Sequence, residues 1–269
     1  MIAVVDYQKG NLKSVERGLI AAGGEAFITA DASEIAKADA IVLPGVGAFA
    51  DAATTMCELG QMEAIRDRVR AGVPFLGICL GEHLMFEHGV EGAPEGNPAC
   101  GLGLLPGTVV AMPRCDAQGK AFKVPHVGWN TIEIPACSGD AAVPPCGEGG
   151  GNVVLSSGGA GGGAARSSAA KRGLFEHGAS PGSAPQAGSE LAFACPLFDG
   201  IAPGEYFYFT HSYIAPTGSH TIAETTHSVR FTSAVQFGER AFGVQFHPEK
   251  SSDAGARVLA NFVAIAARG

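Results

Sequence analysis

The chain has 269 residues, of which 46% are hydrophobic and 16% are charged, so it can bury the core of one large domain. The formal net charge is −8 and the Lys and Arg residues form no stripe, which argues against a nucleic-acid-binding protein. No apolar run approaches the roughly 20 residues of a membrane span, and the first residues, MIAVVDY, do not resemble a leader, so we expect a cytoplasmic protein without a membrane partner.

Strand and helix patterns alternate over the first hundred residues. Apolar residues recur at helical spacing over 12–19, up to the helix-terminating Gly23-Gly24, and again over 62–69. Short apolar runs that suit buried strands lie at 2–5, 26–29, 40–43 and 73–78. This alternation predicts an α/β fold, with one mostly parallel, open sheet flanked by helices.

The second half of the chain is richer in strands. Extended stretches lie at 108–112, 131–134, 206–209, 233–237 and 241–246. A final helix is predicted from Asp253. Four of its apolar residues share one side, namely Val258, Leu259, Phe262 and Val263.

The segment 138–190 differs from the rest in composition. Gly, Ala, Ser and Pro make up 36 of its 53 residues, in counts of 14, 10, 8 and 4. Such a sequence cannot bury enough apolar surface to offset the entropy of ordering the chain. We therefore expect a single domain over 1–269 that contains a flexible, Gly/Ala/Ser-rich surface insertion at 138–190.

The seven cysteines include no CxxC pair, so neither a zinc site nor a disulfide framework is predicted. Only Cys79 has surroundings that suggest chemistry. It is the centre of Gly77-Ile78-Cys79-Leu80-Gly81, after an apolar strand and before residues 80–87, which can form a helix. This is the pattern of a nucleophile elbow with a thiol in place of a serine hydroxyl. Its glycines remove Cβ atoms that would collide, and a helix N-terminus stabilises a thiolate.

A thiolate needs a proton shuttle, and His247 is the strongest candidate among the eight histidines. It ends an apolar strand, where open α/β sheets place their active sites. Glu249 follows two residues later, after Pro248. A carboxylate bound to one imidazole nitrogen fixes the tautomer and directs the other nitrogen toward the sulfur. The sequence therefore predicts a catalytic triad of Cys79, His247 and Glu249.

With an elbow cysteine and a late His-Pro-Glu, the chain resembles the class I (triad) glutamine amidotransferases. Further segments resemble the glutaminase subunit of imidazole glycerol phosphate synthase, from histidine biosynthesis. Those segments are VVDYQKGNLKSV at 4–15, LPGVGAF at 43–49, GICLG at 77–81, GLGLLPG at 101–107, VPHVGWN at 124–130, YFTHSY at 208–213 and FGVQFHPEKS at 242–251. The combination of VPHVGWN with HPEKS is highly specific. The resemblance spans the chain except for the insertion, which that family typically lacks.

This resemblance implies a mechanism for releasing ammonia from glutamine. Cys79 attacks the side-chain amide, and His247 protonates the departing nitrogen to leave a γ-glutamyl thioester. Water activated by His247 then releases glutamate, while Glu249 orients the imidazole. No metal or organic cofactor is implied.

The oxyanion of this reaction needs backbone donors. The resemblance assigns one to the N–H of Leu80 and the other to the 44–47 loop, where we expect the N–H of Val46. Gly45 and Gly47 on either side would let that peptide reorient.

The segment His211-Ser212-Tyr213 matches the family segment that holds the two ends of glutamine, so Ser212 and Tyr213 are predicted substrate contacts. The family usually has Met-Gln after CLG, and that glutamine touches the substrate. This chain has Glu82 and His83 there. We expect His83 to take over the substrate contact as a hydrogen-bond donor, and Glu82 to point to solvent.

Release of ammonia is useful only beside an acceptor. In the resembled family the acceptor is a separate (β/α)8-barrel cyclase subunit, which makes imidazole glycerol phosphate and an aminoimidazole carboxamide ribotide from ammonia that crosses the subunit interface. The resemblance therefore implies a heterodimer with ammonia channelling. Trp129 and Asn130, in VPHVGWN, are the predicted interface residues at the mouth of the passage.

Three alternative hypotheses stay open. The chain could be a glutaminase subunit of another synthase, although VPHVGWN argues against that. It could be a stand-alone γ-glutamyl hydrolase that uses the same elbow without a partner. It could also be a non-catalytic partner subunit, inactivated by the changes at Glu82 and His83.

Overall fold

The computed structural model describes residues 1–135 and 192–268, and its centre is a seven-stranded sheet. In order across the sheet the strands are β11 (Thr221–Thr226), β12 (Arg230–Phe237), β13 (Ala241–Val244), β4 (Phe75–Cys79), β3 (Ala40–Gly45), β1 (Ile2–Val5) and β2 (Ala26–Thr29). The five strands from β13 to β2 run parallel, and β12 and β11 add an antiparallel hairpin at one edge. The predicted mostly parallel sheet is confirmed. The expected insertion at 138–190 lies outside the described residues, so the single-domain prediction over 1–269 stays a prediction.

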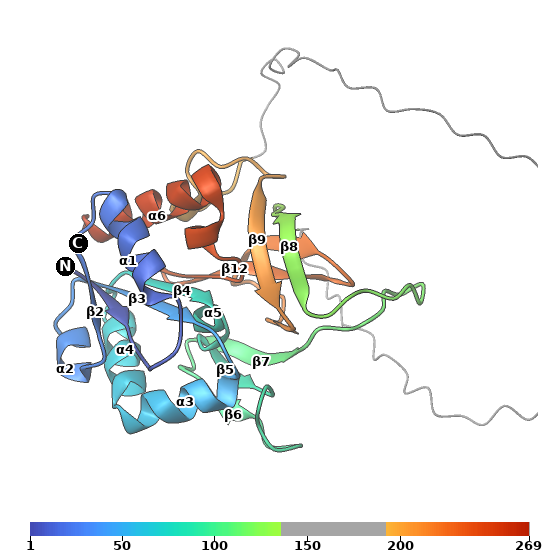
Figure 1. Cartoon of the computed structure of the whole chain (residues 1–269), viewed down its shortest axis with the longest axis horizontal. Helices are drawn as coiled ribbons and strands as arrows, with labels where there is room; N and C mark the ends of the chain where they lie inside the picture. Colours follow the sequence, from blue (N-terminus) through green and yellow to red (C-terminus); the bar gives the residue numbers. More distant parts are fainter. Residues whose placement is uncertain (136–191, 269) are drawn as a thin grey trace, which may run out of the picture. The chain divides into compact units, whose positions relative to one another are not determined.

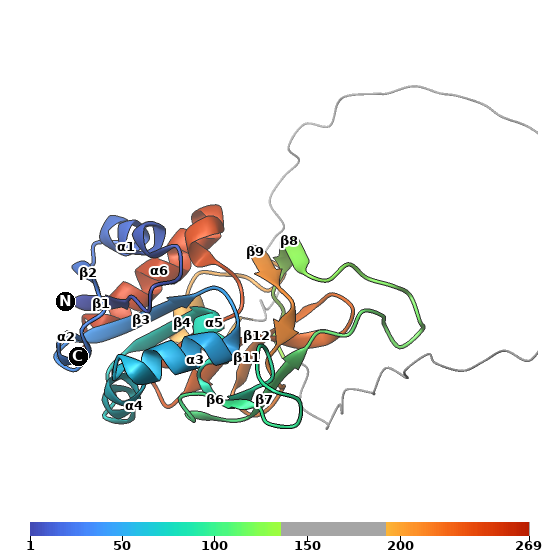
Figure 2. The ribbon, with the colours of Figure 1, turned by 60° about the horizontal axis from the view of Figure 1, so that its bottom comes forward.

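Helices cover both faces of this sheet (Figures 1 and 2). One face carries α1 (Leu12–Ala21) and α6 (Ser252–Ala266), and the other carries α2 (Ala32–Ile35), α3 (Phe49–Glu58) and α4 (Gln61–Arg70). Side chains of β1 alternate between the two cores: Ile2 and Val4 pack toward α1 and α6, whereas Ala3 and Val5 pack toward α3 and α4. This is the period of two that a strand covered on both faces requires. Among the helices of the described residues, none has the length and apolar character needed to cross a bilayer.

The helix predicted over 80–87 is wrong in extent. The helix α5 spans only Leu80–His83, and the chain then forms strand β5 (Phe86–Gly89). In β5, Phe86 pairs with Leu105 of β7 (Leu105–Ala111), and this pairing competes with helix continuation. A second sheet results, with the order β10 (Tyr213–Ile214), β7, β5 and β6 (Ala99–Cys100).

The strand predicted over 131–134 is also misplaced. The strand β8 spans His126–Thr131 and pairs antiparallel with β9 (Tyr206–His211) to form a two-stranded sheet. Beyond Thr131, a single bridge joins Glu133 to Glu224 of β11 instead. The apolar side chains of β8, Val127 and Trp129, are exposed, so β8 shows no run of buried apolar residues that would mark it in the sequence.

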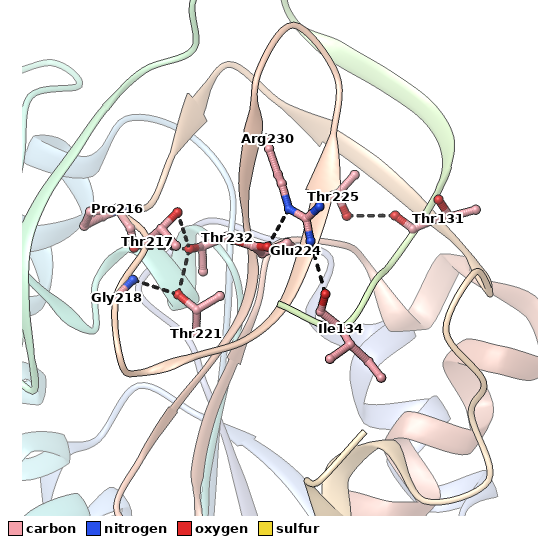
Figure 3. Close-up of polar contacts among 10 residues, drawn as sticks. All are labelled: Thr131, Ile134, Pro216, Thr217, Gly218, Thr221, Glu224, Thr225, Arg230 and Thr232. Carbon is pink, nitrogen blue, oxygen red and sulfur yellow. Dashed lines mark hydrogen bonds and ion pairs between the residues drawn. The ribbon is translucent and has the colours of Figure 1, made fainter. Parts of the chain in front are cut away.

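Polar contacts fasten the chain after β8 to the β11–β12 hairpin (Figure 3). Arg230 forms an ion pair with Glu224 across the hairpin, and its Nη2 donates to the carbonyl of Ile134 at 3.1 Å. The hydroxyl of Thr225 donates to the carbonyl of Thr131 at 2.9 Å. These contacts fix the end of β8, and β8 in turn holds β9 beside the sheet.

Candidate active site

Cys79 lies at the junction of β4 and α5, in a backbone conformation that is rare for a residue with a side chain (φ 54°, ψ −107°). A Cβ atom added at Gly77 would lie 2.5 Å from the carbonyl oxygen of Gly81, and one added at Gly81 would lie 1.8 Å from that of Leu43. Both positions therefore require glycine, which confirms the collision argument from the sequence. Because α5 is only four residues long, the thiolate stabilisation expected from a full helix is small.

A cavity of about 360 Å³ opens beside Cys79, where the carboxyl ends of β3, β4 and β9 meet. Seven of the residues singled out from the sequence lie in its wall: Val46, Gly47, Cys79, Leu80, His83, Ser212 and Tyr213. Its other lining residues are Ala48, Glu91, Pro125, Thr210 and His211. The structure thus brings the elbow, the 44–47 loop and the 211–213 segment around one small cavity, whose size suits a single amino acid.

His247 reaches the elbow from the neighbouring strand, because β13 runs parallel to β4 and both end at the same edge. Its Nδ1 lies 2.9 Å from Oε1 of Glu249, and both side chains are buried. Its Nε2 is also buried and has no hydrogen-bond partner among the described residues. Burial lowers the pKa of His247, but its interactions with Cys79 and Glu249 outweigh that effect and raise the pKa to about 9. The imidazole is therefore protonated at neutral pH.

Gln245 contacts the sulfur of Cys79, and His83 contacts Gln245 in turn. The Nε2 of Gln245 lies 3.7 Å from the sulfur, and its Oε1 lies 2.7 Å from Nε2 of His83. Burial lowers the pKa of His83 to about 4, against the opposing effect of the bond to Gln245, so the ring is neutral. His83 lies in the cavity wall, but one of its nitrogens is already engaged, and its contact with glutamine stays a prediction.

Glu82 does not point to solvent, so that expectation is wrong. Its side chain is fully buried under the elbow. It occupies space that the missing side chain of Gly243 leaves open, because a Cβ atom added at Gly243 would lie 2.7 Å from the Glu82 Cγ. Neither carboxyl oxygen has a hydrogen-bond partner within residues 1–135 and 192–268. Burial, and secondly the negative charge of Cys79, raise the pKa of Glu82 well above its usual range, which favours the protonated acid.

The loop expected to supply the second oxyanion donor is already hydrogen-bonded. The N–H of Val46 donates to the hydroxyl of Tyr7 at 3.1 Å. Tyr7 is fully buried, and burial raises its pKa, so the hydroxyl keeps its proton. A Cβ on Gly45 would lie 2.5 Å from that hydroxyl, whereas Gly47 has φ +98°, which favours glycine.

Sequence reasoning missed Glu91, the one carboxylate among the residues that line the cavity. Burial raises its pKa, an effect that the backbone of Phe49 opposes and the charge of Asp51 adds to. Glu91 lies in a turn-rich stretch, VEGAPEGNP, that contains another glutamate and has no periodicity. No signal in the sequence distinguished it.

Trp129 and Asn130 lie outside the cavity wall. Trp129 is 52% exposed and its ring meets that of Tyr208 edge to face. Asn130 uses its amide within the chain, donating to the carbonyl of Thr226 at 2.9 Å. Their place at an interface stays a prediction.

Three histidines, His126, His211 and His227, form a cluster that includes the cavity wall at His211. Nδ1 of His126 lies 3.0 Å from Nε2 of His211, and the ring of His126 stacks on that of His227 at 4.3 Å between centroids. Burial lowers the pKa of His126 to about 4 and that of His211 well below its usual range, so both rings are neutral. In the part of the chain that the structure describes, no group of three or more His, Cys, Asp or Glu side chains is arranged to hold a metal ion.

A family model and individual related proteins assign this chain to the same family. The family model described as glutamine amidotransferase class-I matches residues 3–266. The imidazole glycerol phosphate synthase subunit HisH of Moorella thermoacetica is 36% identical over 263 residues, which cover 97% of this chain and 93% of that protein. The subunit of the same name from Rhodopirellula baltica is 35% identical over 264 residues, with 97% and 96% covered.

Solved structures resemble the fold at lower identity. A structure described as a glutamine amidotransferase has a TM-score of 0.58 and 16% identity, covering 99% of this chain and 100% of its own. PurLQS from Thermotoga maritima has a TM-score of 0.56 and 14% identity, with 98% and 97% covered. These likenesses support the class I fold.

Proposed function

The chain belongs to the class-I glutamine amidotransferases, as a HisH glutaminase subunit of imidazole glycerol phosphate synthase in histidine biosynthesis, and from this membership we propose the roles of its residues. Cys79 is the nucleophile, His247 the proton shuttle and Glu249 the residue that orients it. One observation carries this proposal: Nδ1 of the imidazole binds Glu249 at 2.9 Å, while Nε2 has no hydrogen-bond partner among the described residues and the interaction with Cys79 raises the pKa of the ring.

In the first half of the reaction, the thiolate of Cys79 attacks the side-chain carbonyl carbon of glutamine. A C–S bond forms and the carbonyl oxygen becomes an oxyanion. His247, protonated at neutral pH because its pKa is about 9, gives its Nε2 proton to the amide nitrogen. The C–N bond then breaks, ammonia leaves and a γ-glutamyl thioester remains.

In the second half, His247 is neutral and acts as a base. Its Nε2 takes a proton from water, and the water oxygen attacks the thioester carbon. The C–S bond breaks, glutamate leaves, and the imidazolium and thiolate are restored. Glu249 stabilises each imidazolium state, since its carboxylate is buried beside Nδ1.

We assign the oxyanion to the backbone N–H groups of Leu80 and Val46, with Gly45 and Gly47 permitting the loop to turn. Leu80 follows the nucleophile directly and lies in the cavity wall. Val46 also lies in the wall, but its N–H is bound to the Tyr7 hydroxyl and must leave that partner before it can donate to the oxyanion.

The ends of glutamine need partners of opposite charge. Ser212 and Tyr213, both in the cavity wall, suit the carboxylate end through their hydroxyl and backbone groups. Glu91 suits the α-ammonium group, because it is the carboxylate that faces this space. A free amino acid therefore fits the site better than a peptide would.

We infer that the outward face of the β8–β9 sheet meets the cyclase subunit, a (β/α)8 barrel in the family that the sequence resembles. Val127 and Trp129 on β8 and Tyr206 on β9 expose 56%, 52% and 55% of their surface. Val127 pairs with Thr210, which lies in the cavity wall. An apolar surface that begins at the site of ammonia release suits a heterodimer that channels ammonia. A cytoplasmic location belongs to the same proposal and follows from the synthase assignment.

Labelling with a γ-electrophilic glutamine analogue tests this function. The chain is treated alone, with the cyclase subunit, and with the cyclase and its substrate, and the Cys79 peptide is followed by mass spectrometry. We expect labelling of Cys79 that rises with the cyclase, and none in Cys79→Ala. Full glutamine turnover by the isolated chain would instead indicate a stand-alone γ-glutamyl hydrolase. Absence of labelling in all conditions would indicate a non-catalytic subunit.

A further inference from the structure

Two buried side chains beside the nucleophile have no role in the mechanism above. Nε2 of Gln245 lies 3.7 Å from the sulfur of Cys79, and Oε1 of the same amide lies 2.7 Å from Nε2 of His83. Gln245 is 0% exposed and His83 is 3% exposed. A substrate in the cavity therefore cannot reach the Gln245 amide, whose two ends are occupied by the sulfur and the imidazole.

We propose that Gln245 stabilises the thiolate of Cys79 by donating a hydrogen bond to its sulfur, and that His83 is a positioning residue that fixes the orientation of the Gln245 amide. This inference rests on the proposed role of Cys79 as the nucleophile. It assigns His83 a role through Gln245, in place of the direct contact with glutamine that its position in the sequence suggested.

The chemistry of an amide permits only one productive orientation. A thiolate accepts hydrogen bonds, so the NH₂ end of Gln245 must face the sulfur. The carbonyl end then faces His83, which must donate through Nε2–H. If the proton of His83 were on Nδ1 alone, Nε2 would be an acceptor, and the amide would turn its carbonyl oxygen toward the sulfur. That orientation would disfavour the thiolate.

Within residues 1–135 and 192–268, the Gln245 side-chain amide has hydrogen bonds only to Cys79 and His83. Gln245 follows β13, with its side chain on the face that α5 covers, two residues after Gly243. Ser233 lies opposite on β12, where its carbonyl accepts from the N–H of Gln245 at 3.0 Å. The Ser233 hydroxyl and the Glu82 carboxyl are buried without hydrogen-bond partners in the described residues, so neither binds the amide.

A donor at this position serves both halves of the reaction. The attacking species is a thiolate, and the second half ends when the C–S bond breaks and returns a thiolate. The γ-glutamyl thioester between them has a neutral sulfur. A hydrogen bond to the charged sulfur is stronger than one to the neutral sulfur, so Gln245 favours the start and the end of the cycle.

The pH profile of Cys79 alkylation by iodoacetamide, followed on the Cys79 peptide, measures this effect without glutamine turnover. We expect Gln245→Leu to move the midpoint about one pH unit upward, so that alkylation slows about tenfold at pH values below the midpoint of the parent. His83→Phe keeps a ring but removes the donor, and should move the midpoint in the same direction. His83→Gln restores a donor and should recover most of the rate.

Ser233→Ala is the matched control, because it changes a buried side chain on the same face that makes no hydrogen bond in the described residues. It should leave the alkylation profile unchanged, and thermal unfolding of all four variants identifies any that fail to fold. In the complex with the cyclase, His83→Phe should lower kcat and leave KM for glutamine nearly constant. An unchanged midpoint in Gln245→Leu, or a raised KM with an unchanged midpoint in His83→Phe, would overturn the proposal. Failure of the proposed function is distinct, since it appears as absence of Cys79 labelling by the glutamine analogue.

Discussion

The N–H of Val46 and the hydroxyl of Tyr7 are joined by a hydrogen bond of 3.1 Å on the rim of the cavity. Tyr7 comes from the loop after β1 and Val46 from the loop after β3, two adjacent parallel strands. The donor that we assign to the oxyanion is therefore held by a buried neutral hydroxyl. The proposed reaction requires this bond to break, so Tyr7 opposes turnover until the loop turns.

Tyr7→Phe should raise the glutaminase rate of the isolated chain, because it removes the hydroxyl and keeps the ring. A net contribution of about 1 kcal/mol from the lost hydrogen bond corresponds to roughly a fivefold increase in the population of the turned loop. Steady-state release of glutamate, with and without the cyclase, measures the change. Stimulation by the cyclase should decrease by a similar factor. A slower isolated chain with normal thermal stability would mean that the hydroxyl assists the oxyanion site.

The sequence predicted this site well where a chemical pattern fixes local geometry. Glycines at 77 and 81 indicated a close backbone approach, and the structure places their missing Cβ atoms 2.5 Å or less from carbonyl oxygens. His247 and Glu249 are two residues apart, and the 3-10 turn Pro248–Lys250 brings their side chains together. In both cases, residues close in sequence determine the arrangement.

Prediction failed where long-range packing decides. The helix α3 shows the apolar spacing of Phe49, Ala52, Ala53 and Met56, but small alanines gave a weak signal and it was missed. The sequence analysis expects Glu82 to point to solvent, whereas its place on α5 and the missing side chain of Gly243 put it in the core. Contacts such as that of Tyr7 with Val46 join segments far apart in the sequence, and no local sequence pattern predicts them.

Glu249→Gln should lower kcat by roughly two to four orders of magnitude, because an amide cannot stabilise the imidazolium of His247. Glu249 is one of the two groups that raise the pKa of His247 to about 9, so the substitution should move that pKa downward. NMR titration of the His247 ring measures the shift. Because folding raises the pKa of His247 from 6.5 to about 9, its proton stabilises the folded state fully below pH 6.5, and this contribution is lost as the pH rises through 9. The free energy of unfolding of the parent should therefore fall more than that of the variant over this range. An unchanged titration would contradict the assignment of Glu249.

Glu82→Gln should stabilise the chain increasingly as the pH rises. The folded state holds the Glu82 proton because burial raises its pKa, whereas the unfolded state releases it above about pH 4.5. The parent therefore loses about 1.4 kcal/mol of folding free energy for each pH unit between that value and the folded pKa. Urea denaturation of both proteins from pH 5 to pH 8 measures the difference. Glu63→Gln, on the exposed side of α4, is the control and should show no trend. A constant difference between parent and Glu82→Gln would mean that Glu82 is ionised in the folded state.

Glu91→Gln tests how the substrate is held. The Glu91 carboxylate faces the cavity, and the α-ammonium group of glutamine is the cationic group that the proposed substrate brings to it. Loss of a charged hydrogen bond worth about 1.5–3 kcal/mol should raise KM about tenfold to a hundredfold, with kcat at saturation largely retained. Initial rates over a range of glutamine concentrations, in the complex with the cyclase, separate the two parameters. Glu95→Gln is a suitable control, since Glu95 is exposed and lies outside the cavity wall. A loss confined to kcat would place Glu91 in the chemistry of the site instead of in substrate binding.

Glutamine without its α-amino group provides a second check. The parent should bind that analogue as weakly as Glu91→Gln binds glutamine. The variant should discriminate little between glutamine and the analogue.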